Sequence, residues 1–161
     1  MISTTAGDTR RVNSRIEALN SFSGFPAAGW AQAAGPPGPY VLQAEIAACH
    51  ARARTAEETD WHRIAAIYAA LAQLAPSPVV ELNRAVAVAM AEGPAAGLAL
   101  VDAIAGDPKL ASYHLLPSVR GDLLAKLGRH AEASAEFTRA AELARNARER
   151  ELLLARAKAL G

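Results

Sequence analysis

Residues 121–140, GDLLAKLGRHAEASAEFTRA, decide the fold of this chain. One amphipathic run ends at Gly128, and Ala133, Phe137 and Ala140 form an i, i+4, i+7 stripe on the next run. Gly128 lies between the two runs, where the C-terminus of a helix favours a residue that tolerates positive φ. Small residues on both runs allow two antiparallel helices to approach closely, with Phe137 filling the space between them. The stretch therefore predicts a helix hairpin.

The spacing of these small and aromatic residues resembles the tetratricopeptide repeat, a helix–turn–helix unit of about 34 residues. The positions that carry the resemblance are Gly121, Leu124, Gly128, Ala133, Phe137 and Ala140. Leu124 replaces the aromatic residue that is usual in the family, and the usual Trp of the first helix is absent. A hairpin of this kind is typical of scaffold proteins that bind other molecules. It does not by itself indicate what this chain binds.

The composition narrows the class of protein. The chain has 161 residues, enough for one domain, and 52% are hydrophobic but only 5% aromatic, which predicts thin helix-to-helix contacts. The 17 basic and 16 acidic residues give a net charge of +1, which offers no sign of a nucleic-acid-binding surface. A single cysteine, Cys49, excludes an internal disulfide framework and suits a reducing compartment. No apolar run reaches the roughly 18 residues of a membrane span and no signal-peptide pattern occurs, so we expect a soluble cytoplasmic protein.

Residues 1–38 differ in composition from the rest of the chain. Asp8 is placed to cap a short helix with an apolar side of Val12, Ile16 and Leu19. The following stretch, SFSGFPAAGWAQAAGPPGPY, is rich in Gly, Pro and Ser and cannot continue a helix. We expect a flexible tail over residues 1–38 and a helical domain over residues 39–161. The alternative is an arm that docks on the first helices through Phe22, Phe25 and Trp30.

Proline and capping residues predict the helix starts from Pro39 onward. Pro39 suits the first turn of a helix, Asp60 suits an N-cap, and Ser77 before Pro78 combines both signals. The helices predicted in this way span residues 39–54, 61–75, 78–91, 94–105, 130–144 and 147–160. Their expected inward residues include Trp61, Ile64, Tyr68, Leu71, Leu98, Val101 and Ala105.

Pro117 interrupts the segment between residues 108 and 127. A proline within a helix removes a hydrogen bond and costs roughly 3 kcal/mol, so we expect a break there, with the main helix starting near Pro117. Val119, Leu123 and Leu127 form the expected inward stripe of that helix. Asn146 followed by Glu149 resembles a capping box, with Asn in place of Ser or Thr, at the start of the last helix.

The second helices of the predicted pairs begin near Trp61, Pro94 and His130, close to one tetratricopeptide period apart. The sequence therefore predicts an all-α fold, a short right-handed solenoid of about three helix pairs. The last helix, within RNARERELLLARAKAL, has charge on one side and leucine on the other, which suits a C-terminal capping helix.

A longer resemblance covers the chain from about Pro39 to its C-terminus. Its most distinctive phrases are PSPVVELNRAVAVAMAEGP, residues 76–94, and YHLLPSVRGDLLAKLGR, residues 113–129. They resemble the C-terminal extension of a group of bacterial extracytoplasmic-function sigma factors that carry a tetratricopeptide-like domain. The resemblance implies a protein-interaction module in the regulation of transcription initiation, with the sigma modules or RNA polymerase as its partner.

One departure from that family matters for function. Members carry two helical modules upstream, one for the −10 element and core polymerase and one for the −35 element. Residues 1–38 are too short for either and lack a basic recognition helix, so we expect no promoter binding by this chain alone. A free-standing adaptor that binds a peptide of another protein is the alternative. A truncated gene, a stand-alone paralogue, the isolated extension and a homodimer all stay open.

Residues with potential chemistry form no convincing catalytic or metal-binding pattern. No two of the four histidines lie four residues apart on one helix face, so a metal site has weak support. Cys49, His50 and Glu45 are explained more simply as a core thiol beside polar helix residues. Ser112 and His114 bracket one residue and do not form a nucleophile–base pair. We expect no enzymatic activity, no metal and no cofactor.

Asn83 and Arg84 stand out as a polar pair within an apolar helix. In one interpretation, Asn83 hydrogen-bonds a neighbouring helix and Arg84 reaches solvent. In the other, Asn83 lies on the concave face that first helices line in tetratricopeptide proteins, where amide and guanidinium donors suit an extended peptide or a carboxylate. The candidate groove residues are Gln43, Asn83, Arg84, Tyr113, His114, Arg120 and Asp122. For Tyr113 and His114, packing of the turn before Pro117 is the alternative.

Overall fold

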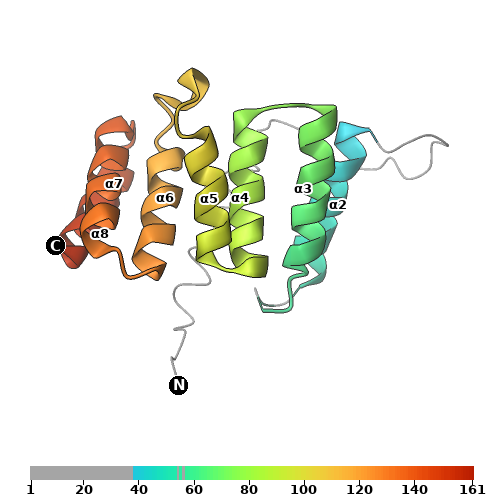
Figure 1. The fold of residues 1–161 in the computed structure, drawn as a ribbon, viewed down its shortest axis with the longest axis horizontal. Coiled ribbons are helices and arrows are strands. Elements are labelled where there is room, and N and C mark those ends of the chain that lie inside the picture. The colour runs from blue at the N-terminus through green and yellow to red at the C-terminus, as the bar shows by residue number, and fades with distance from the viewer. Residues whose placement is uncertain (1–37, 54, 56) are drawn as a thin grey trace.

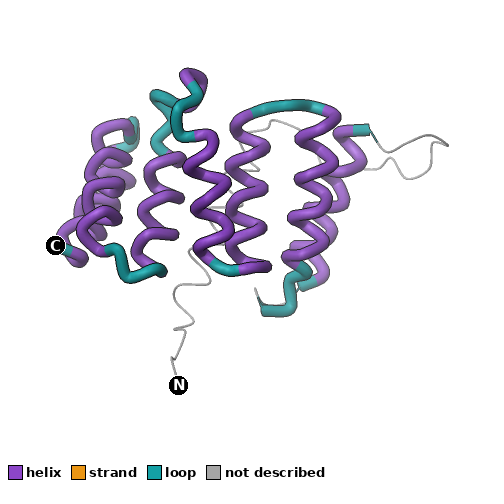
Figure 2. Tube along the Cα trace, in the orientation of Figure 1, coloured by secondary structure: helices purple, strands orange, loops and turns teal. Residues whose placement is uncertain are grey.

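The computed structural model describes residues 38–161 except 54 and 56, so the predictions for residues 1–37 lie outside it. All regular structure in the described part is helical, and no strand occurs there (Figure 2). The helices are α2 (Pro39–Arg52), α3 (Trp61–Leu74), α4 (Pro78–Glu92), α5 (Pro94–Ile104), the 3₁₀ helix η1 (Pro108–Leu110), α6 (Leu115–Lys126), α7 (His130–Leu143) and α8 (Ala147–Leu160). Figure 1 shows them in a row, from α2 and α3 at one end to α7 and α8 at the other. The fold is all-α and built of helix hairpins, as predicted; the right-handed sense of the array stays a prediction.

The predicted helix starts are confirmed. Pro39, Pro78 and Pro94 occupy the first position of α2, α4 and α5, where the missing N–H costs no helical hydrogen bond. The Asp60 carboxylate caps α3 by accepting a hydrogen bond of 2.9 Å from the backbone N–H of Arg63. Ser77 has the extended backbone of an N-cap residue, but its hydroxyl makes no capping hydrogen bond.

The chain breaks between α5 and α6 slightly earlier than Pro117. Asp107 accepts a hydrogen bond from the backbone N–H of Lys109, and the segment after it forms η1 and a turn instead of an α-helix. Pro117 is the third residue of α6. The first-turn N–H groups of a helix have no acceptor within it, so a proline is tolerated there.

The hairpin of α6 and α7 forms as the sequence predicts. Gly128 has φ of 76°, and the N–H of Arg129 donates to the carbonyl of Leu124, which closes the end of α6. Phe137 is fully buried. A Cβ added to Gly121 would lie 3.0 Å from the Phe137 ring. Because Gly121 has no side chain, the ring of Phe137 packs directly against the backbone of α6 at this position.

A second close approach joins α4 and α5 and was not predicted. A Cβ added to Gly97 would lie 2.4 Å from the Cβ of Ala89 and 2.7 Å from the carbonyl oxygen of Ala85. Only glycine fits at this position without a shift of the backbone. The two helices therefore touch almost backbone to backbone.

The buried side chains form two cores that meet on α4. The first core, between α2, α3 and α4, consists of Leu42, Ile46, Cys49, Trp61, Ile64, Ile67, Tyr68, Leu71 and Ala87. The second core runs from α4 to α8 and contains Leu82, Ala85, Leu98, Val101, Leu110, Leu116, Val119, Leu123, Leu124, Ala133, Phe137, Ala140, Ala141, Ala144, Leu153 and Ala157. Two predicted inward residues are wrong. Ala105 and Leu127 follow the last residues of α5 and α6, where the chain has left the packed face, and both are exposed.

Candidate functional site

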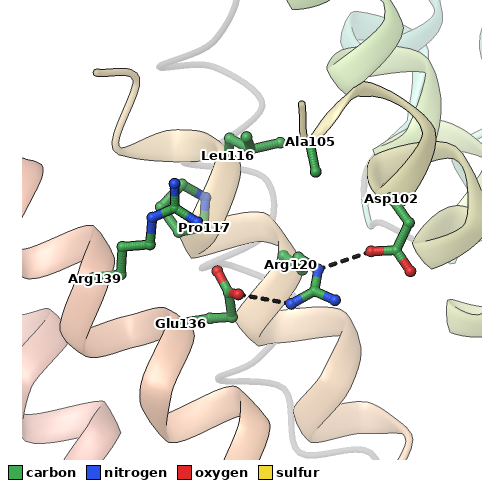
Figure 3. A pocket seen from close by; sticks show the side chains of 7 residues that line it. All are labelled: Asp102, Ala105, Leu116, Pro117, Arg120, Glu136 and Arg139. Carbon is green, nitrogen blue, oxygen red and sulfur yellow. Dashed lines mark hydrogen bonds and ion pairs between the residues drawn. The ribbon is translucent and has the colours of Figure 1, made fainter. Parts of the chain in front are cut away.

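A cavity of about 290 Å³ lies where α5, α6 and α7 meet (Figure 3). We call it the Arg120 pocket. Its lining residues come from three helices and the residue after α5: Asp102, Ala105, Leu116, Pro117, Arg120, Glu136 and Arg139. They include two carboxylates and two guanidinium groups but no hydroxyl, thiol or imidazole. Carboxylate and guanidinium groups beside an apolar wall can bind a polar ligand through hydrogen bonds and ion pairs.

Arg120 holds the polar side of the pocket together. Its Nε donates to Oδ1 of Asp102 on α5 at 2.8 Å, and its Nη1 donates to Oε1 of Glu136 on α7 at 2.6 Å. The hydrogen bond with Asp102 is the largest of the effects that raise the Arg120 pKa; the hydrogen bond with Glu136 raises it further. The Arg120 side chain is one-quarter exposed, so both bonds are only partly screened by water. One side chain thus links three helices.

The other side of the pocket is apolar. Leu116 and Pro117 are buried, and the exposed Ala105 lies at the solvent side of this apolar wall. Arg139 is exposed at the edge of the pocket, and Figure 3 shows its guanidinium group beside Pro117. Within residues 38–161, leaving out 54 and 56, Arg139 forms no salt bridge.

Of the seven residues predicted to line a groove, only Arg120 contributes to this pocket. Tyr113 is half-buried against the second core, and burial raises the pKa of its phenol. His114 precedes α6, and its Nε2 lies 3.0 Å from Oε1 of Glu149 on α8. Both residues therefore pack the turn before α6. The capping box expected at Asn146 forms only in part, since Asn146 caps the N–H of Arg148 while Glu149 contacts His114.

Asp122 faces away from Arg120. It forms a salt bridge with Arg156 of α8, and the Arg156 guanidinium carbon lies 4.1 Å from the centroid of the Phe137 ring. Because α-helical residues advance by about 100° each, positions two apart point about 200° from one another. The expectation that Arg120 and Asp122 share one face is therefore wrong.

The remaining predicted residues lie outside the pocket, Asn83 and Arg84 on α4 and Gln43 on α2. Arg84 donates to Glu81 on its own helix at 3.0 Å. Asn83 lines a cavity of only about 10 Å³ beside the first core, and its buried Oδ1 has no hydrogen-bond partner among the described residues. Gln43 is half-buried on α2. The structure thus does not bring the seven residues together in one groove.

Tyr68, which lines the same small cavity as Asn83, is the most strongly perturbed titratable group of the first core. Its side chain is buried, and removal from water raises the pKa of its phenol to about 12. Tyr68 is therefore neutral at physiological pH.

The residues considered as metal ligands are held apart by their packing. Cys49 is buried, the His50 ring packs edge-on against Trp61 with centroids 5.4 Å apart, and Glu45 lies 4.0 Å from Arg63. The described part of the chain contains no cluster of three His, Cys, Asp or Glu side chains able to hold a metal ion. No described helix is long and apolar enough to cross a membrane.

The Arg120 pocket was missed because no sequence signal brings its charges together. Asp102, Glu136 and Arg139 each occupy a helix face whose spacing also suits a solvated surface. Only the approach of α5 to α6, and of α6 to α7, puts residues 102, 120 and 136 within hydrogen-bonding distance.

Comparisons with known proteins find a relative that shares most of the described region. A protein of Rhizobium meliloti (strain 1021), described as uncharacterized, is 53% identical over 113 residues, which are 70% of this chain and 26% of the relative. The match thus spans about a quarter of the length of that protein. No family model matches the chain. No solved structure is significantly similar to it.

Proposed function

We propose that this chain is a non-catalytic interaction domain of an extracytoplasmic-function type of sigma factor, acting in the regulation of transcription initiation. The observation that carries the proposal is the helix-hairpin array that begins at Pro39. Residues 76–94 and 113–129, which resemble the sigma-factor extension, form α4 and α6 together with the turns that flank them. Its partner in this proposal is RNA polymerase or the sigma modules, which places it in the cytoplasm.

Two further observations support this assignment. The matched region is only 26% of a longer relative, which leaves room in that relative for additional modules. The net charge of this chain is +1, and phosphate contacts dominate DNA affinity, so promoter recognition is assigned to other modules.

A free-standing adaptor that binds a peptide is the second candidate, and the Arg120 pocket is the feature that favours it.

The test uses the full chain, immobilised through an affinity tag. Purified bacterial core RNA polymerase and the isolated −10 and −35 modules of a family member are passed over it separately, with bare resin as the control. Stoichiometric retention of either partner is the expected result. Retention of neither, together with a different stoichiometric partner from native cell extract, would replace the sigma proposal with the adaptor.

A gel shift with a family-type promoter at low salt accompanies this test. We expect no binding by the chain alone. Submicromolar affinity that falls steeply with salt would contradict the proposal, because it would reveal phosphate contacts made by this chain itself.

A further inference from the structure

We infer that the Arg120 pocket binds one carboxylate group together with the apolar side chain next to it. The inference deepens the proposed function and rests on it, since it names the chemistry that an interacting protein segment would present. The occupant is either the C-terminal residue of a partner chain or an acidic side chain beside an apolar one.

The four charges of the lining balance, and Arg139 is the one charged lining residue that forms no salt bridge in the described part of the chain. Asp102 and Glu136 are both hydrogen-bonded to Arg120, so a cationic ligand would have to compete with a guanidinium group already in place. With Arg139 included, the lining contains two positive and two negative groups. Arg139 is exposed and forms no salt bridge in the described part of the chain, so its guanidinium group can pair with a carboxylate of the ligand. One carboxylate suits this balance better than a phosphate dianion.

The bonds around Arg120 also leave donors available. A guanidinium group has five N–H donors, and the two hydrogen bonds to Asp102 and Glu136 use one on Nε and one on Nη1. The plane of the group is fixed by partners on α5 and α7, which lowers the entropy lost when a ligand binds. Arg120 is therefore a preorganised second donor in the same pocket as Arg139.

The volume of the pocket and its apolar wall indicate what the ligand carries next to its carboxylate. About 290 Å³ is at the lower limit of small-molecule sites, which suits one residue of a peptide rather than a cofactor. Ala105, Leu116 and Pro117 offer an apolar surface next to the guanidinium groups. A leucine-like side chain on that surface and a carboxylate on Arg139 would fill the pocket together.

The experiment measures NMR chemical shifts of the full chain, labelled with ¹⁵N, during titration with N-acetyl-leucine. Two further probes are its uncharged amide and the amidated dipeptide acetyl-Leu-Glu, which carries its carboxylate on a side chain. We expect the acid to shift the Nε–H signals of Arg120 and Arg139 and the amide of Leu116, and the uncharged amide to be at least tenfold weaker. A response to acetyl-Leu-Glu equal to that of N-acetyl-leucine assigns an internal acidic residue, and a much weaker one assigns a C-terminus.

Three variants make the assignment specific. Arg139→Gln should weaken binding at least tenfold, and Ala105→Leu should abolish it by filling the apolar side. Arg145→Gln is the matched control, an exposed arginine outside the pocket, and should bind as the parent does. Equal shifts from acid and amide, unchanged binding by Arg139→Gln, or no shifts at about 20 mM of either carboxylate probe would overturn the inference. RNA polymerase retention does not depend on these probes, so the proposed function and the pocket assignment can fail separately.

Discussion

The first core and the second core are packed in different ways. The first core contains large side chains with polar atoms, among them Trp61, Tyr68 and the Cys49 thiol. The second core contains alanine and leucine around one aromatic residue, Phe137, and depends on close backbone approach at two glycines. The stability of the second core should therefore depend most on the volume of its side chains. The stability of the first core should depend on the protonation of its polar side chains. Each of the following substitutions tests one side of this difference.

The largest expected effect is that of Phe137→Ala. The ring is fully buried, and the alanine neighbours around it are too small to fill the space that its removal leaves. We expect a loss of about 3–5 kcal/mol in the free energy of unfolding and a drop of roughly 10 °C or more in Tm. Thermal melts followed by circular dichroism measure it, with the exposed Leu152→Ala as the control. A Phe137→Ala variant that melts like the parent would contradict the packing of the α6–α7 hairpin.

Adding one methyl group should distinguish the two glycine contacts. Gly97→Ala meets a backbone oxygen at 2.7 Å and a Cβ at 2.4 Å, so the helices must separate. We expect it to lose about 2–3 kcal/mol despite the better helix propensity of alanine. Gly121→Ala has the ring of Phe137 as its nearest neighbour, at 3.0 Å, and should lose about 1 kcal/mol. Urea denaturation of both variants checks the order, and the reverse order would show that the α4–α5 contact is the more adaptable.

The first core should lose stability at alkaline pH through Tyr68. Its pKa is raised from 10.0 to about 12 by burial, so the folded state keeps the proton while the unfolded state releases it. The stabilisation is complete below pH 10 and is lost as the pH rises toward 12, by up to about 1.4 kcal/mol per pH unit. Urea midpoints between pH 9 and 11.5 measure the slope, which should be shallower in Tyr68→Phe. Equal slopes would show that Tyr68 does not limit alkaline stability.

The smallest effect on stability is expected at Arg84, on the surface of α4. Its salt bridge with Glu81 joins two side chains that are about one-third exposed and lie on one helix, so Arg84→Ala should cost only about 0.3–0.5 kcal/mol. Thermal melts check this value. A loss above about 1.5 kcal/mol would mean that the aliphatic part of Arg84 supports one of the cores.

The course of the helices could be predicted from the sequence because local chemistry determines where they begin. Pro39, Pro78 and Pro94 fix helical φ angles, and Asp60 satisfies a free N–H, whatever the rest of the chain does. The packing of Phe137 against Gly121 could also be predicted, because the spacing of small and aromatic residues in residues 121–140 resembles a tetratricopeptide repeat. The close contact at Gly97 could not be predicted in the same way. A glycine within a helix lowers helix propensity, and its role in packing becomes visible only once the neighbouring helix, here α4, is placed.

The candidate site could be predicted only in part, for reasons of geometry. Arg120 was expected to bind, but its partners Asp102 and Glu136 lie 18 and 16 residues away and depend on tertiary packing. For Asn83 the sequence left open a groove position or a hydrogen bond to a neighbouring helix, yet its buried Oδ1 has no partner among the described residues. A polar residue within an apolar helix can face either way, and only the position of the neighbouring helices decides which.

The sharing of α4 by both cores has a consequence for local opening. Ala87 belongs to the first core and Ala85 to the second, and Val86 packs against both. In a linear array each helix is protected by its neighbours, and separation at either end leaves α4 covered on its other side. Its amide protons should therefore exchange with solvent only when the whole domain unfolds, while those of α2 and α8 exchange through fraying of the two ends. The slowest-exchanging helix is thus expected in the middle of the described array, away from its two ends.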